Sequence, residues 1–175
     1  MSDYGKCSVT QCAAMSVATG ANESEIEAIL REPALTETRA ECLAIAREHQ
    51  VGQYTWGGFA DVCYAICRLN KPAIVLETGV AFGWTSAFIL AALEVNGKGH
   101  LHSVDLPAFR PGASRITGAV VPDRLRHRST LLPGPQCQLL PRLLAAANAV
   151  HSFPSCSAQP YPARSAGRRP AWPSP

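Results

Sequence analysis

AIVLETGVAFGWTS, residues 73–86, is the stretch that decides the fold of this 175-residue chain. It opens with a short apolar run, residues 73–76, which is typical of a buried parallel strand. Gly79 and Gly83 then bracket a turn with the small Ala81 between them, so the backbone can pass close to a ligand. The sequence therefore predicts a strand that ends in a ligand-facing turn.

A helix and a second strand are predicted to follow this turn. Residues 86–94 carry an apolar helical pattern, and Asn96-Gly97 is a typical helix end. Residues 100–104 form the next predicted strand, which delivers Asp105 at its carboxyl end. Because ligands of open parallel sheets bind at the carboxyl ends of the strands, we expect Glu77, the glycine turn and Asp105 to converge there.

Two acidic residues indicate the kind of ligand. Asp105 follows the glycine turn by about 20 residues, the spacing at which a carboxylate typically holds two ribose hydroxyls. A dinucleotide motif of the form GxGxxG would place its third small residue at Trp84, whose indole is too large for close packing of helix on strand. Glu77 would repel a pyrophosphate, whereas it would attract the ammonium and sulfonium of S-adenosylmethionine.

These motifs resemble the class I S-adenosylmethionine-dependent methyltransferases, in the small-molecule branch often labelled methyltransferase domain 24. The first motif of that family, hydrophobic-hydrophobic-E/D-x-G-x-x-x-G, matches Val75 to Gly83. Its second motif, an acid that ends the second strand, matches Asp105. Similar landmarks continue at residues 118–123 and 139–144, and the resemblance covers about residues 36–146.

The resemblance implies a cofactor site and an activity. Glu77 would face the amino-acid end of S-adenosylmethionine and Asp105 would hold its ribose. The full set of implied cofactor-binding residues is Glu77, Thr78, Gly79, Ala81, Gly83 and Asp105. The implied reaction is methyl transfer to an oxygen or nitrogen of a small molecule. Where the family usually has an acid that contacts adenine, this chain has Pro135 and Gln136 after Gly134, and no residue is assigned as the catalytic base.

The expected fold is α/β: a Rossmann-like parallel sheet of about three to four strands with flanking helices, limited to the N-terminal half of the family's domain. Residues 1–21 are expected to be disordered, residues 22–149 to form this partial domain, and residues 150–175 to be a disordered tail rich in Pro, Ser and Arg. Capping boxes at Ser24 and Thr38 predict two helices before the sheet, and the apolar repeat of residues 59–66 predicts a third. Further expected elements are a strand at 129–132 and a helix at 138–149.

The net charge of +3 averages two unlike parts of the chain. Residues 1–123 hold 9 Lys and Arg and all 13 acids, a net −4, whereas residues 124–175 hold 7 Arg and no acid or Lys, a net +7. These arginines are scattered among Pro, Ala and Ser, which disfavours specific nucleic-acid recognition. We interpret the tail as a shifted reading frame or aberrant terminus joined near residues 145–150, with a natural Pro-rich tail as the alternative.

The remaining residue types are consistent with a single domain in a reducing compartment. Seven cysteines without framework spacing favour free thiols and the cytoplasm, and Cys63 and Cys67 are interpreted as buried structural thiols. His100 and His102 are interpreted as structural, and no metal site is predicted. No apolar run has the roughly 20 residues needed to span a bilayer.

Three functions from different classes fit these observations. The first is an active methyltransferase with a small-molecule acceptor. The second is an inactive remnant or interaction module that lacks the catalytic half. The third is a nicotinamide-dependent oxidoreductase, which Glu77 and Trp84 disfavour.

Overall fold

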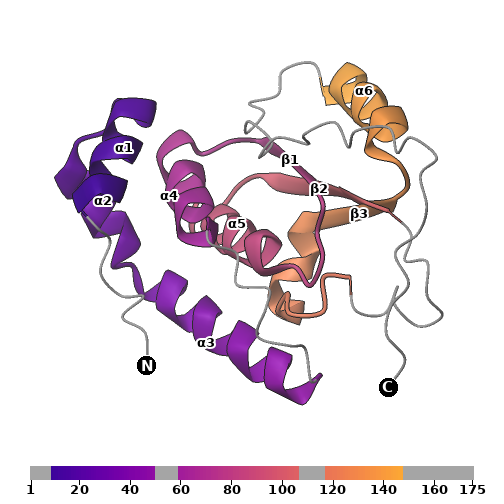
Figure 1. Cartoon of the computed structure of the whole chain (residues 1–175), viewed down its shortest axis with the longest axis horizontal. Helices are drawn as coiled ribbons and strands as arrows, with labels where there is room; N and C mark the ends of the chain where they lie inside the picture. The colour runs from indigo at the N-terminus through magenta and orange to yellow at the C-terminus, as the bar shows by residue number, and fades with distance from the viewer. Residues whose placement is uncertain (1–8, 50–58, 107–116, 148–175) are drawn as a thin grey trace, which may run out of the picture.

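A three-stranded parallel sheet lies at the centre of the chain, for which the computed structural model describes residues 9–49, 59–106 and 117–147. The strands are β1 (Ile74–Thr78), β2 (His100–Asp105) and β3 (Ser129–Pro133), in the order β1-β2-β3 (Figure 1). Glu77 on β1 pairs with Ser103 on β2, and Asp105 pairs with Pro133 on β3. This confirms the predicted α/β, Rossmann-like class.

Helices flank the sheet on both sides. Before the sheet come α1 (Val9–Thr19), α2 (Glu23–Leu30), α3 (Pro33–Glu48) and α4 (Ala60–Asn70). Between and after the strands come α5 (Trp84–Val95), the short 3-10 helix η3 (Asp123–Arg128) and α6 (Gln136–Ala147). In Figure 1 the sheet lies between α5 and α6, and α3 and α4 pack on α5 from outside.

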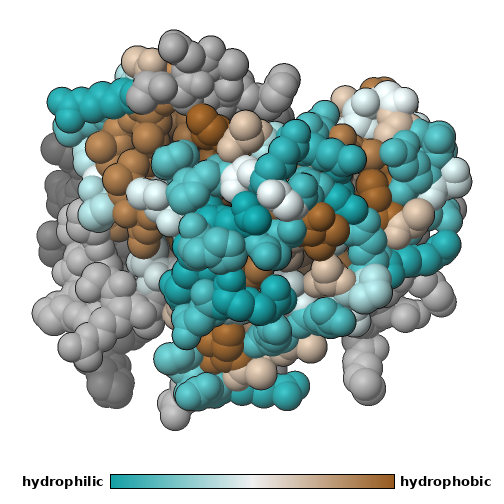
Figure 2. Space-filling view, turned by 180° about the vertical axis from the view of Figure 1, so that it is seen from behind, coloured by the Kyte–Doolittle hydropathy of each residue, from teal (hydrophilic) through white to brown (hydrophobic). Residues whose placement is uncertain are grey.

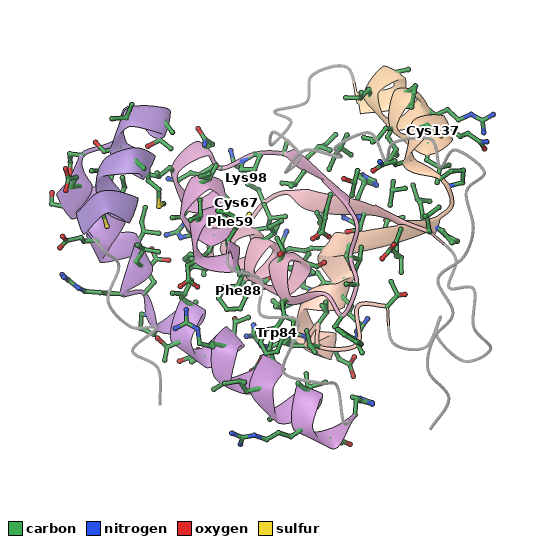
Figure 3. The ribbon with its side chains drawn as sticks, in the orientation of Figure 1. Phe59, Cys67, Trp84, Phe88, Lys98 and Cys137 are labelled. Carbon is green, nitrogen blue, oxygen red and sulfur yellow. The ribbon has the colours of Figure 1, made fainter. Side chains whose placement is uncertain are left out.

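The core is centred on α5, the helix that connects β1 to β2. Its side chains are buried nearly all round, because the sheet covers one side of the helix while α3 and α4 cover the other. Trp84 and Phe88 point from α5 toward α3 (Figure 3), and the Arg39 guanidinium of α3 lies 5.7 Å from the centre of the Phe88 ring. This packing fixes the start of α5, and with it the turn that precedes the helix.

The expectation of a disordered N-terminus is wrong for residues 9–19, which form α1. Cys12 and Met15 are buried in the core cluster, and Thr19 donates a hydrogen bond to the carbonyl of Met15 at 2.7 Å. A few buried side chains on a helix of small residues are enough to dock it, a feature that composition alone does not reveal. Residues 1–8 lie outside the described residues.

Two predicted helix starts are displaced. The side chain of Asn22 caps α2 by accepting from the backbone N–H of Glu25 at 2.8 Å, while Ser24, the predicted cap, donates to Asn22. The next helix begins at Pro33, so Thr38 lies inside α3 and is buried. Asn caps helices as well as Ser does, and Pro is favoured in a first turn, so these nearby signals prevailed.

Two other helices differ from prediction in the face that they bury. Tyr64, Ala65 and Cys67 are the fully buried side chains of α4, whereas Phe59, just before the helix, is 63% exposed. The α6 helix forms as predicted but contains Pro141, and its leucines are half-buried or exposed. The predicted tail, residues 150–175, lies outside the described residues.

The surface seen from behind carries hydrophobic groups on both sides of a hydrophilic band (Figure 2). Large hydrophobic residues with substantial exposure come from several elements: Val17, Phe59, Val95, Leu106, Leu131 and Leu144. None of the helices in the described ranges has both the length and the apolar character needed to cross a membrane.

Candidate functional site

Glu77 is a buried carboxylate held by two serine hydroxyls. It lies near the end of β1 on the sheet face that carries α5, and its relative exposure is 9%. Ser86 of α5 donates to its Oε2 at 2.7 Å, and Ser103 of β2 donates to the same oxygen at 2.8 Å. Burial raises the pKa of Glu77, the two hydroxyl donors lower it, and the negative charge of Asp105 raises it.

The charge of Glu77 lacks a counter-ion in the described part of the chain. The acids that form ion pairs in those ranges lie elsewhere: Glu27, Glu32, Glu41, Asp61, Glu94 and Asp123. An ionised carboxylate is costly to bury unless it is paired and hydrogen-bonded. Glu77 therefore has two hydroxyl donors but no cationic side chain paired with it among the described residues.

Asp105 organises the glycine turn through its carboxylate. Its Oδ2 accepts hydrogen bonds from the backbone N–H groups of Val80 and Ala81, each at 3.0 Å. Its Oδ1 accepts one from the N–H of Leu106 at 2.8 Å. A carboxylate offers about four acceptor positions, so these three bonds leave capacity for one further donor.

The turn between β1 and α5 has one crowded glycine and one open glycine. Gly83 has φ +88°, and a Cβ there would lie 2.8 Å from both the Gly118 Cα and a methyl carbon of Val121. Gly79 has φ +76°, and a Cβ there would meet no atom within 4 Å. Ala81 is exposed and also adopts a positive φ, 48°. The backbone at Gly79 is thus accessible to a ligand, whereas Gly83 serves packing.

The predicted site residues fall into two groups. Glu77, Gly79, Ala81 and Asp105 lie together around the turn at the carboxyl edge of β1 and β2. Thr78 and Gly83 are placed differently. Thr78 is the next residue after Glu77 on β1, so its side chain is on the opposite sheet face. Gly83 faces Gly118.

Sequence reasoning missed Ser86 and Ser103, the two partners of Glu77. Both are nearly inaccessible, with exposures of 3% and 4%. The sequence does hold a weak signal for them, because each is a small polar residue within an otherwise apolar segment. Ser86 lies in the first turn of α5, and Ser103 lies on β2 beside Glu77. Neither residue carries enough chemistry of its own to stand out in a sequence.

The carboxyl end of β3 offers no acid to the site. Gly134 donates its N–H to the carbonyl oxygen of Asp105 at 2.8 Å, and a Cβ at Gly134 would lie 2.8 Å from the Leu139 side chain. The next two residues are Pro135 and Gln136. The predicted departure from the family pattern lies here, because an amide side chain and a proline follow Gly134 where the family has an acid.

The remaining thiols and histidines form no metal centre in the described ranges. Burial raises the pKa of the Cys63 thiol to about 11 and that of Cys67 to about 12. His100 shares a hydrogen bond of 2.8 Å with the Thr130 hydroxyl, and its ring centre lies 4.8 Å from that of His102. Figure 3 shows Cys137 on α6, well apart from Cys67.

The similarities of this chain to known proteins are all similarities to solved structures. An O-methyltransferase from Bacillus cereus in complex with SAH is 13% identical; the match covers 66% of this chain and 50% of that one, with a TM-score of 0.45. A putative O-methyltransferase from Klebsiella pneumoniae is 19% identical, with coverages of 75% and 56% and a TM-score of 0.44. The O-methyltransferase TomG from Streptomyces achromogenes, involved in tomaymycin synthesis and in complex with SAM, is 22% identical, with coverages of 65% and 48% and a TM-score of 0.40.

The chain spans about half the length of these structures. No protein-family model matches the sequence, and no curated protein matches it.

Proposed function

We propose that the chain binds S-adenosylmethionine at the turn between β1 and α5, as a class I methyltransferase does. The observation that carries this proposal is the buried carboxylate of Glu77, which has two hydroxyl donors and no cationic partner among the described residues. The ammonium of the cofactor's amino-acid end is a cation of suitable charge for this place. The open backbone at Gly79 allows close approach beside it.

Asp105 is assigned to the ribose. After three backbone donors its carboxylate has one acceptor position left, which suits a single strong hydrogen bond from a ribose hydroxyl. Ala81 and Gly79 line the turn, while Gly83 sets its shape. Thr78 contributes through its backbone position alone.

The cofactor would supply a methyl group already activated by its sulfonium, so the protein contributes mainly by aligning the reactants. In the overall reaction a new bond forms between an acceptor oxygen or nitrogen and the methyl carbon. The carbon–sulfur bond breaks, and the acceptor proton passes to solvent or a base. The proposed acceptor is a small molecule. We assign no residue of this chain as that base.

The second candidate is a module that binds the cofactor, or a partner, without turnover. This candidate is kept because we assign no described residue as the base that would accept the acceptor proton. A nicotinamide cofactor is less well suited, because the negative charge of Glu77 beside the turn opposes a pyrophosphate.

Calorimetric titration of the full chain with S-adenosylhomocysteine and, separately, with NADH tests the proposal. Circular dichroism of the same sample establishes that the chain is folded. Saturable binding of S-adenosylhomocysteine with no response to NADH supports the methyltransferase assignment. Binding of NADH alone, or no binding of S-adenosylhomocysteine to folded protein at millimolar concentration, refutes it.

A further inference from the structure

The carboxylate of Glu77 is held from two directions. Ser86 lies in the first turn of α5 and Ser103 lies on β2, so the two hydroxyls reach Oε2 from different elements. No hydrogen bond to Oε1 comes from a described residue. A carboxylate whose one oxygen is fixed by two donors has a set orientation, and its other oxygen remains an acceptor.

We propose that Ser86 and Ser103 are positioning residues of the cofactor site, which fix Oε2 of Glu77 so that Oε1 is presented to the ligand's ammonium. This inference rests on the proposed function. It adds two residues that neither motif contains and gives them a shared role, because together they oppose the effect of burial on the pKa of Glu77 and hold its carboxyl group aligned before the ligand arrives. Neither serine is itself assigned a contact with the cofactor.

A purely structural role explains the arrangement less well. Packing between α5 and the sheet needs no charge at position 77, and an apolar residue or glutamine there avoids burying a carboxylate without a counter-ion. Two buried hydroxyls that converge on one oxygen satisfy an anion, since hydrogen bonds to charged groups are the stronger ones. The arrangement is therefore suited to keeping a negative charge in place.

The charged and titratable groups around Glu77 set the expected pH dependence. Asp105 on β2 and Cys63 on α4 are the groups whose charges couple to it. The negative charge of Asp105 raises the pKa of Glu77, whereas the Cys63 thiol, whose own pKa is raised to about 11, is uncharged near neutral pH. The two serine hydroxyls are the groups that lower the pKa of Glu77. Removing either hydroxyl is expected to move protonation of Glu77 to higher pH.

The test uses Ser86→Ala and Ser103→Ala, with Ser129→Ala as the matched control. The Ser129 hydroxyl also donates a hydrogen bond, but to the carbonyl of Arg126 on the surface. Two measurements are made on the full chain: the carbon NMR titration of the Glu77 carboxyl without ligand, and the affinity for S-adenosylhomocysteine as a function of pH. Circular dichroism confirms folding, and Ser103→Thr restores a hydroxyl if the alanine variant does not fold.

The expected result is that each alanine variant titrates Glu77 at higher pH and loses about tenfold in affinity at neutral pH, the effect of one hydrogen bond to a charged group. The loss becomes larger as pH falls, and Ser129→Ala behaves as wild type. An unchanged Glu77 titration in both variants overturns the inference. If wild type fails to bind S-adenosylhomocysteine while the Glu77 titration still shifts, the proposed function fails but the role of the serines in holding the carboxylate stands.

Discussion

Asp105 and Val80 are 25 residues apart in the sequence, yet Oδ2 of Asp105 accepts the Val80 backbone N–H at 3.0 Å. The same oxygen accepts the N–H of Ala81, also at 3.0 Å. The end of β2 therefore holds the turn that follows β1. In this chain the acid is a structural element of the turn in addition to the ligand role proposed for it.

Replacing Asp105 by alanine is expected to loosen the turn. Two backbone donors lose their acceptor, which costs about 1–3 kcal/mol of unfolding free energy where such groups are buried and less where water replaces the acceptor. Denaturant unfolding measures this loss, and amide exchange at Val80 and Ala81 locates it. Asp123→Ala, at a fully exposed acid, is the control and should leave both unchanged. Equal behaviour of the two variants would contradict the role given to Asp105.

Gly79 and Gly83 are expected to respond differently to alanine. Both have positive φ, so each substitution strains the backbone by about 1 kcal/mol. Only Gly83→Ala adds a clash, with Gly118 and Val121, so its melting temperature should fall much further. Gly79→Ala should stay folded but bind S-adenosylhomocysteine weakly, because its methyl group fills the open side of the turn. Thermal unfolding and calorimetry measure the two effects.

Glu77→Gln should weaken ligand binding without lowering the stability of the fold at pH 7. The pKa of Glu77 is raised in the folded state, so its protonated form is favoured by folding, and stability is lost as pH rises from about 4.5 through the folded pKa. The glutamine variant lacks this loss, so at pH 7 it should be at least as stable as wild type while it binds the ligand more weakly.

Glu94→Gln should change the pH dependence of the unfolding free energy in the opposite direction to Glu77→Gln. The hydrogen bond from Arg128 lowers the pKa of Glu94, so this acid contributes stability above its unfolded pKa that is lost as pH falls. Unfolding midpoints are therefore measured between pH 4 and 8 for wild type and for each glutamine variant. As pH rises, wild type should gain stability relative to Glu94→Gln and lose stability relative to Glu77→Gln. The same sign for both acids would contradict the burial of Glu77.

The thiols should react in the order of their exposure. Cys137 is exposed on α6, whereas Cys42 and Cys67 are buried and burial raises the pKa of each to about 12. Brief treatment with iodoacetamide, followed by peptide mass mapping, should modify Cys137 and spare the other two. Modification of Cys67 at a comparable rate would show that α4 does not pack on α5 as described.

The sequence was sufficient to predict the sheet because its signals are local. Residues 74–78 and 100–105 form strands at the places where apolar runs, glycines and a terminal acid indicate them, and the parallel order follows from the helix between them. Glu77 and Asp105 meet because adjacent parallel strands end at the same edge.

Other features depended on contacts that a sequence pattern does not encode. Docking of α1 depends on where Cys12 and Met15 come to lie, and the start of α3 was decided by Pro33 over a capping box of similar strength. The partners of Glu77 were hidden for the same reason, since Ser86 and Ser103 acquire a role only when three elements are brought together.

The most direct test of S-adenosylmethionine binding at this turn is nitrogen–proton NMR of the full chain during titration with S-adenosylhomocysteine. Binding at the proposed site predicts saturable shifts of the Gly79, Val80 and Ala81 amides, with resonances of α1 unchanged. Saturable binding that leaves these three amides unmoved, or folded protein that shows no binding, would contradict it.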